Sequence, residues 1–90
     1  MKGEFRKTDL NSVTSSRGFT VDLRFAGGIH YRDSASDLAI DAEWLLNPPR
    51  ILLYRQRGGS VPDRRLDEVY SNVQNALEYL GHRVEIHLVG

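Results

Sequence analysis

Hydrophobic and polar residues alternate along much of the chain, with the period of β-strands that bury one face. Residues 19–25 show this alternation most clearly, and Ala26-Gly27-Gly28 directly after them favours a tight hairpin turn. Residues 29–32 and 38–42 continue the alternation, and the second of these runs on towards Trp44. The pattern predicts three antiparallel strands joined by short turns.

A fourth strand is predicted at residues 51–54, where the apolar residues are continuous. A single helix covers only one face of a sheet, so either Leu52 and Tyr54 or Ile51 and Leu53 must point away from it. A leucine and a tyrosine ringed by charged residues are typical of the centre of a protein interface. We therefore expect residues of this strand on the open face of the sheet.

The helix is predicted from apolar residues at three- and four-residue steps between 66 and 80. Pro62 and Asp63 favour a helix start just before this stripe, and Gly81 favours the left-handed turn that ends a helix. Residues 83–88 then alternate as a last strand. The predicted order is β-β-β-β-α-β.

This order predicts an α+β fold, with a mostly antiparallel sheet of four or five strands and one long helix on one face. The helix returns the last strand beside a partner in the same sheet, and the opposite face is expected to be wet. Residues 1–17 follow neither period, so we expect a flexible arm or a weak edge strand there. Residues 18–90 form the single α+β domain. Alternatively, the arm covers the open face, with Phe5 or Leu10 as a lid.

Composition narrows the classes of function. Twelve Lys and Arg balance twelve Asp and Glu among the 90 residues, so no net charge attracts the chain to nucleic acid or to an anionic membrane. There is no cysteine, and no apolar stretch approaches the roughly 20 residues of a membrane span. No secretory signal is recognisable at the start. We expect a cytoplasmic protein that makes no membrane contact.

Charge is segregated along the chain, although its sum is zero. Residues 33–49 contain four acidic side chains and no base, whereas residues 50–65 contain five arginines and one acid. Either the two runs form neighbouring patches that select a partner, or they pair and cancel. The candidates for partner binding are Asp33, Asp37, Asp41, Glu43, Leu52, Tyr54, Arg55 and Arg57.

Catalytic and cofactor motifs are not recognisable. The three histidines do not have the spacing of a metal site, so we expect no metal and no cofactor. A Gly58-Gly59-Ser60 stretch before the helix has neither the lysine nor the spacing of a phosphate-binding loop. We therefore expect a protein that is not an enzyme and that binds another protein.

Two other functions stay open. The arginines of residues 50–65 would suit a nucleic-acid-binding module, although acidic residues on the open face oppose phosphate. Alternatively, the chain buries its open face against a second copy, so it is a monomer or a homodimer. Trp44 is either an anchor of the binding surface or a residue at the edge of the core, and the adjacent Leu45 and Leu46 favour the core edge.

Over roughly residues 28–88, the order of parts resembles a family of small bacterial immunity proteins that neutralise polymorphic toxins, the family numbered seventy-four. The similarity comprises a strand with acids at residues 40–43, the aliphatic strand 51–54 ending in tyrosine, a connection bearing Pro62, the helix, and the strand 84–86. The family's tryptophan before that proline has no counterpart here. The resemblance implies a non-enzymatic protein that binds and blocks a cognate toxin domain.

Overall fold

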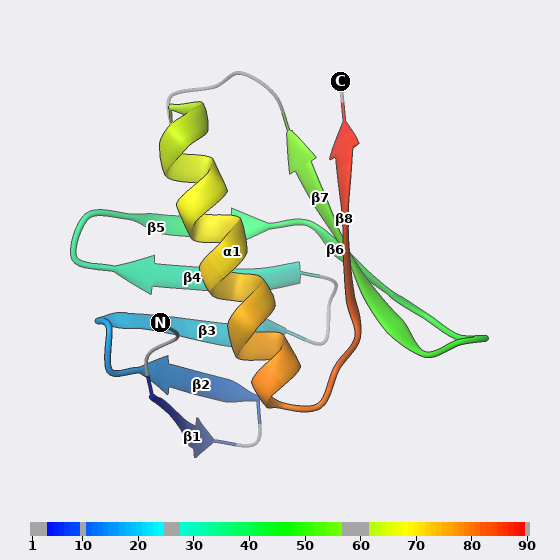
Figure 1. The fold of residues 1–90 in the computed structure, drawn as a ribbon, viewed down its shortest axis with the longest axis horizontal. Helices are drawn as coiled ribbons and strands as arrows, with labels where there is room; N and C mark the ends of the chain where they lie inside the picture. The colour runs from blue at the N-terminus through cyan, green and yellow to red at the C-terminus, as the bar shows by residue number, and fades with distance from the viewer. Residues whose placement is uncertain (1–3, 10, 25–27, 57–61, 90) are drawn as a thin grey trace.

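The computed structural model describes residues 4–9, 11–24, 28–56 and 62–89, which form eight strands and one helix (Figure 1). The elements are β1 (Phe5–Asp9), β2 (Ser12–Ser15), β3 (Phe19–Arg24), β4 (Gly28–Asp33), β5 (Asp37–Ile40), β6 (Ala42–Leu45), β7 (Arg50–Gln56), α1 (Asp63–Tyr79) and β8 (Val84–Val89). The predicted α+β class, the long helix and the antiparallel main sheet are confirmed. The strands differ from the prediction in that they divide between two sheets.

The larger sheet contains β1 to β5 in chain order, and all of its neighbours are antiparallel. Val21 on β3 stands between Val13 on β2 and Tyr31 on β4, and all three side chains are fully buried. Their alternation with polar residues gives the sheet one apolar face. The predicted turn residues Ala26 and Gly27 lie outside the described residues, but β3 and β4 on either side pair as a hairpin would.

The N-terminal segment extends the larger sheet instead of crossing it. β1 forms its outer edge and β2 pairs with β3, so residues 5–15 add two strands where an arm or one weak edge strand was expected. The Phe5 ring contacts the ring of Tyr79 at a centroid distance of 5.3 Å, on the side of α1. Phe5 is therefore not a lid over the open face, and Leu10 lies outside the described residues.

The single strand predicted at residues 38–42 is two strands in two different sheets. β5 pairs with β4, whereas β6 pairs with β7, and the chain passes between the sheets at Asp41. The Asp41 carbonyl accepts a hydrogen bond from the Tyr54 N–H at 2.9 Å, so the crossing point stays bonded to the small sheet. Alternation continues through this bend, which is why the pattern alone did not reveal it.

The small sheet has the order β6-β7-β8. β7 and β8 run parallel, as expected for strands joined by a helical crossover, and β6 is antiparallel to β7. Ile51 and Leu53 on β7 are almost fully buried, so they face α1, and Leu52 and Tyr54 point to the other side. The structure therefore resolves the two orientations that the sequence left open.

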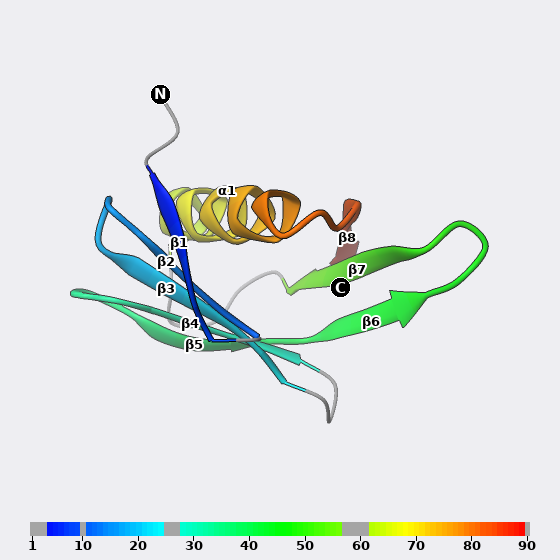
Figure 2. The same ribbon diagram turned by 90° about the horizontal axis from the view of Figure 1, so that it is seen from below.

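One helix covers both sheets. Figure 2 shows α1 on one face of β1–β5, and Figure 1 shows β7 and β8 alongside it. Its stripe of Val69, Val73 and Leu77 is fully buried against the sheets. Burial of several such side chains, each contributing about 1.5–3 kcal/mol, is the main stabilising term of this fold.

The helix ends in the turn that Gly81 predicts. Gly81 has φ +93°, its N–H donates to the Glu78 carbonyl at 2.9 Å, and the His82 N–H donates to the Leu77 carbonyl at 3.0 Å. This pair of bonds is the Schellman arrangement, which satisfies carbonyl groups at the end of a helix. It directs the chain from α1 into β8.

Candidate functional site

Asp33, the first acid of the predicted acidic run, lies under α1. Its carboxylate accepts a hydrogen bond from the Tyr31 hydroxyl at 2.6 Å and pairs with the Arg65 guanidinium. Asn72 donates to the Tyr31 hydroxyl at 3.2 Å, so the helix and the larger sheet share one polar network. Burial would raise the pKa of Asp33, but the bonds from Tyr31, Arg65 and the Ala35 N–H lower it to about 2. The Asp33 carboxylate is therefore bonded within the fold, where it links the larger sheet to α1.

Asp37 lies on the open face of the larger sheet, where it pairs with His30. The opposite ring nitrogen of His30 is 3.8 Å from the Asp22 carboxylate, and Arg32 lies 3.6 Å from the same carboxylate. Ser12 also donates to Asp22, at 2.5 Å. Charges of both signs are therefore interleaved on this face, and it forms no acidic patch.

Asp41 is exposed at the junction of the two sheets. It borders a pocket of about 280 Å³ whose other lining residues come from β5, β7 and α1. Tyr70 in this lining donates its hydroxyl to the Tyr54 carbonyl at 2.7 Å. The Tyr70 hydroxyl is thus already bonded, and no histidine, lysine or second carboxylate is among the described residues that line the pocket.

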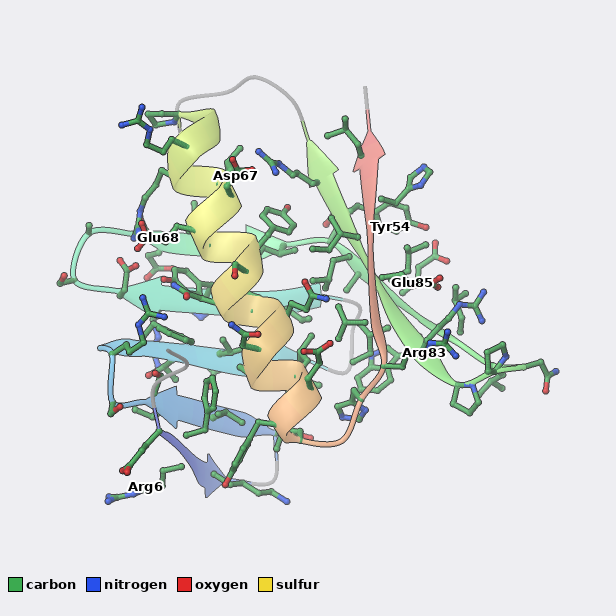
Figure 3. The ribbon with its side chains drawn as sticks, in the orientation of Figure 1. Arg6, Tyr54, Asp67, Glu68, Arg83 and Glu85 are labelled. Atoms are coloured by element: carbon green, nitrogen blue, oxygen red, sulfur yellow. The ribbon has the colours of Figure 1, made fainter. Side chains whose placement is uncertain are left out.

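Glu43, Leu52 and Tyr54 meet on the side of the small sheet that faces away from α1, which we call the small-sheet face. Figure 3 shows Tyr54 and Glu85 projecting on this side. The small-sheet face consists of Glu43, Leu45, Arg50, Leu52, Tyr54, Glu85 and His87. It has an apolar centre of half-buried side chains with charged residues around it.

Contacts within the small-sheet face order its side chains. Leu52 on β7 stands between Glu43 on β6 and Glu85 on β8. A hydrogen bond to the Glu43 carboxylate, together with burial, raises the pKa of the Tyr54 hydroxyl. The Tyr54 ring also meets the His87 ring edge-on at a centroid distance of 6.1 Å. A tyrosine held in this way loses little side-chain freedom on binding, which favours an interface anchor.

The arginines of the predicted basic run are dispersed. Arg50 lies on the small-sheet face and bonds Glu85 at 2.5 Å, whereas Arg55 turns to the helix side, where it pairs with Asp67 and lies over the Tyr70 ring. Arg57 lies outside the described residues. Of the described acids that pair with the arginines of this run, only Asp33 belongs to the acidic run. The arginines that the structure describes form no continuous strip.

Trp44 departs from the sequence interpretation. Its side chain is 52% exposed and does not lie at the core edge. The ring meets His82 edge-on at a centroid distance of 5.0 Å, where β6 passes the end of the helix. Neighbouring Leu46 is 78% exposed, so this part of the chain presents apolar side chains to water. Trp44 lies within β6, opposite Ile51, so the strand alternation alone did not reveal its exposure.

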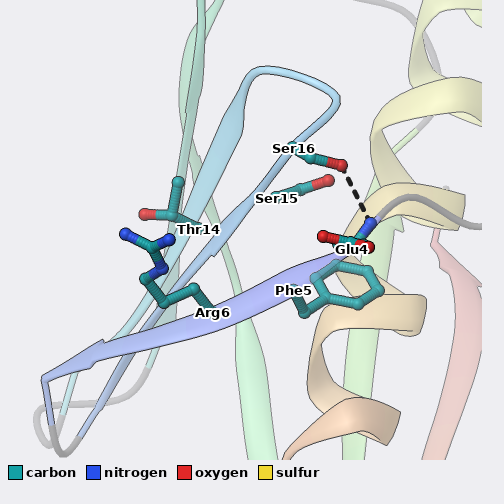
Figure 4. Close-up of a pocket in the computed structure, with 6 residues that line it drawn as sticks. All are labelled: Glu4, Phe5, Arg6, Thr14, Ser15 and Ser16. Atoms are coloured by element: carbon teal, nitrogen blue, oxygen red, sulfur yellow. Dashed lines mark hydrogen bonds between the residues drawn. The ribbon is translucent and has the colours of Figure 1, made fainter.

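Another pocket, of about 230 Å³, follows the β1–β2 hairpin (Figure 4). Its hydroxyl groups bond locally: the Ser16 oxygen accepts from the Glu4 N–H at 2.9 Å, and the Ser15 oxygen accepts from the Arg17 N–H at 3.0 Å. No histidine is among the described residues that line it, and both serine oxygens already accept a backbone N–H. The described lining therefore contains no serine–histidine pair.

Comparison with known proteins assigns no function. No protein-family model, curated protein or solved structure matches the chain. In the part of the chain that the structure describes, no three potential metal-ligating side chains come together. Within the same part, no helix is both long and apolar enough to cross a membrane. The small-sheet face is the candidate site that the geometry supports best.

Proposed function

We propose that the chain is a cytoplasmic, non-enzymatic protein-binding domain whose partner docks on the small-sheet face. The observation that carries the proposal is the orientation of β7: Leu52 and Tyr54 point away from the core. The described part of the N-terminal segment forms β1 and β2 of the larger sheet and does not cover them. An apolar centre bounded by charged side chains is the composition of a protein interface. The partner that fits it places an apolar side chain over Leu52 and a base near Glu43.

The most specific form of this proposal is an immunity protein that blocks a bacterial toxin domain. It is supported by the resemblance in the order of parts and by a face that binds without contributing any catalytic group. Nucleic acid is less well suited as a partner, because arginines of the basic run already pair with acids, Arg55 with Asp67 and Arg65 with Asp33.

Growth of bacteria that express a toxin tests this proposal. The toxin to use is the variable C-terminal domain encoded beside this gene, with this chain co-expressed. We expect the wild-type chain to restore growth, and Tyr54→Glu or Leu52→Asp to abolish the rescue.

Ser71→Glu is the matched control, because Ser71 is exposed on α1, which packs on the opposite side of the small sheet. This variant should rescue growth as well as the wild type does. A neighbouring gene that encodes no toxin, or rescue that persists in both small-sheet variants, would refute the proposal. A purified wild-type chain that sediments as a dimer, and a Tyr54→Glu chain that sediments as a monomer, would assign the face to self-association instead.

A further inference from the structure

A second recess lies at the end of the small sheet where β8 begins, beside the small-sheet face. Its volume is about 250 Å³. The described residues that line it are Trp44, Leu45, Leu46, Pro49, Arg50, Gly81, His82 and Arg83. They come from the β6–β7 connection and from the turn after α1, which are distant in sequence. We call this recess the tryptophan pocket.

The polar side chains that line the tryptophan pocket are basic residues. Two arginines and a histidine contribute to it, and none of the described lining residues is acidic. Arg50 is fixed by Glu85 at 2.5 Å and by the Pro48 carbonyl at 2.9 Å. By contrast, the exposed Arg83 guanidinium has no acidic partner among the described residues, and Figure 3 shows it at this end of the sheet.

The apolar side chains that line the tryptophan pocket are largely exposed to solvent. Trp44 is 52% exposed and Leu46 is 78% exposed, whereas the core side chains of the same sheet are almost fully buried. The edge-on contact with His82 fixes one side of the indole, so the other surface stays available. An exposed tryptophan next to arginine is the composition of an interface hot spot.

We propose that the tryptophan pocket binds an acidic segment of the protein partner, with an Asp or Glu carboxylate at Arg83 and an adjacent apolar side chain against Trp44. Charge complementarity selects this occupant. A carboxylate supplies the acidic partner that Arg83 lacks among the described residues, and a basic segment would be repelled. The recess is smaller than the roughly 300–1,000 Å³ of sites for drug-sized ligands, and it suits one or two side chains.

This inference rests on the proposed function, because it adds an acidic anchor to the partner that docks on the adjoining face. It gives that partner a polarity: a base towards Glu43 and an acid towards Arg83. A second copy of this chain is not required, because the site is formed within one chain.

The experiment uses the only tryptophan of the chain as the reporter. The probe is the dipeptide acetyl-Leu-Asp-amide, with acetyl-Leu-Asn-amide as the neutral control. Titration is followed by Trp44 fluorescence and by the single indole N–H signal in proton–nitrogen NMR spectra. We expect saturable changes with the acidic dipeptide at millimolar concentration and binding about fivefold to tenfold weaker for the Asn control.

Two variants locate the bound carboxylate. Arg83→Gln should weaken binding of the acidic dipeptide about fivefold to tenfold, to the level of the Asn control. Arg64→Gln is the matched control, because Arg64 is an exposed arginine at the opposite end of α1, and it should leave binding unchanged. Equal binding of the two dipeptides, equal effects of the two variants, or no saturable change in either signal would overturn the inference.

The dipeptide needs no toxin, so its result separates this inference from the proposed function. If the acidic dipeptide binds at Arg83 and no adjacent toxin is neutralised, the pocket stands and the immunity function fails. If a toxin is neutralised but its affinity is unchanged in Arg83→Gln, the function stands and the partner does not use the tryptophan pocket.

Discussion

Replacing Asp33 with asparagine tests whether the first acid of the run is structural. The carboxylate is 12% exposed and receives hydrogen bonds from Tyr31 at 2.6 Å and from the Arg65 side chain. Its pKa falls from the model-compound value of 3.8 to about 2 on folding. A shift of this size corresponds to about 2.5 kcal/mol of stability. Since Arg65 is 23% exposed, water screens the pair, and we expect about 1–2 kcal/mol for Asp33→Asn.

The pH dependence distinguishes this ion pair from general damage to the fold. Because the pKa of Asp33 is lower in the folded than in the unfolded chain, its contribution is fully present above about pH 4. It is lost as the pH falls towards 2, where the carboxylate becomes protonated in the folded protein. Urea unfolding of the wild type and of Asp33→Asn, followed by circular dichroism, should therefore differ at pH 7 and converge near pH 2.

Asp67→Asn is the control for this measurement. Asp67 pairs with Arg55 but is 67% exposed, so its replacement should change stability by about 0–1 kcal/mol. An Asp33→Asn chain as stable as the wild type at pH 7 would show that the pair contributes nothing. A difference that persists undiminished at pH 2 would show that the loss comes from packing and not from the charge.

Three further predictions concern packing and the helix end. Leu53→Ala should reduce stability by about 2–5 kcal/mol in urea unfolding, because Leu53 is fully buried, whereas Leu88→Ala at a 48% exposed site should cost less than half as much; equal losses would contradict this difference in burial. Gly81→Ala should cost about 1–2 kcal/mol, because the left-handed φ of +93° is strained for alanine although no atom lies within 4 Å of the added carbon; an unchanged urea midpoint would refute this. Tyr54→Phe should leave the urea midpoint nearly unchanged. In an ultraviolet pH titration it should remove a tyrosine that ionises above the usual pKa, because the hydrogen bond to Glu43 raises the pKa of the Tyr54 hydroxyl. Ionisation of Tyr54 at the usual pKa in the wild type would contradict the contact with Glu43.

The elements with strong periodicity could be predicted from the sequence. The helix stripe from Leu66 to Leu80 and the glycine after it locate α1 and its end, because the spacing of three and four residues fits no other structure. The helix also predicted that the last strand returns beside a partner in the same sheet, and the structure shows this partner to be the parallel β7. The helix and its end are properties of neighbouring residues, which sequence patterns record.

The division into two sheets could not be predicted in this way. Leu38, Ile40 and Ala42 alternate without interruption, although the chain changes sheets between the last two. Period two records which face each residue occupies and not which strand it pairs with. Pairing depends on β4 and β7, which lie on either side of this segment in sequence, so the bend at Asp41 is a tertiary property.

The same limit explains the site residues. Asp33, Asp37, Asp41 and Glu43 are close in sequence, but the strand alternation and the change of sheet give each a different environment. Only Glu43 reaches the small-sheet face. The sequence predicted one acidic run. The fold instead places Asp33 under the helix, Asp37 on the larger sheet, Asp41 at the junction and Glu43 on the small sheet.

This dispersal changes the kind of partner that the chain can select. A uniform acidic patch would attract any basic protein over a distance, with little control of orientation. Here two acids flank the apolar centre, Glu43 and the Glu85 that pairs with Arg50, and Arg83, which has no acidic partner among the described residues, lies at the end of the same sheet. A partner with complementary charges satisfies both Glu43 and Arg83 in only one orientation, and the reversed orientation brings like charges together. In the complex that we propose, apolar contacts at Leu52 and Trp44 would supply affinity, and the separated charges would determine the orientation of the partner.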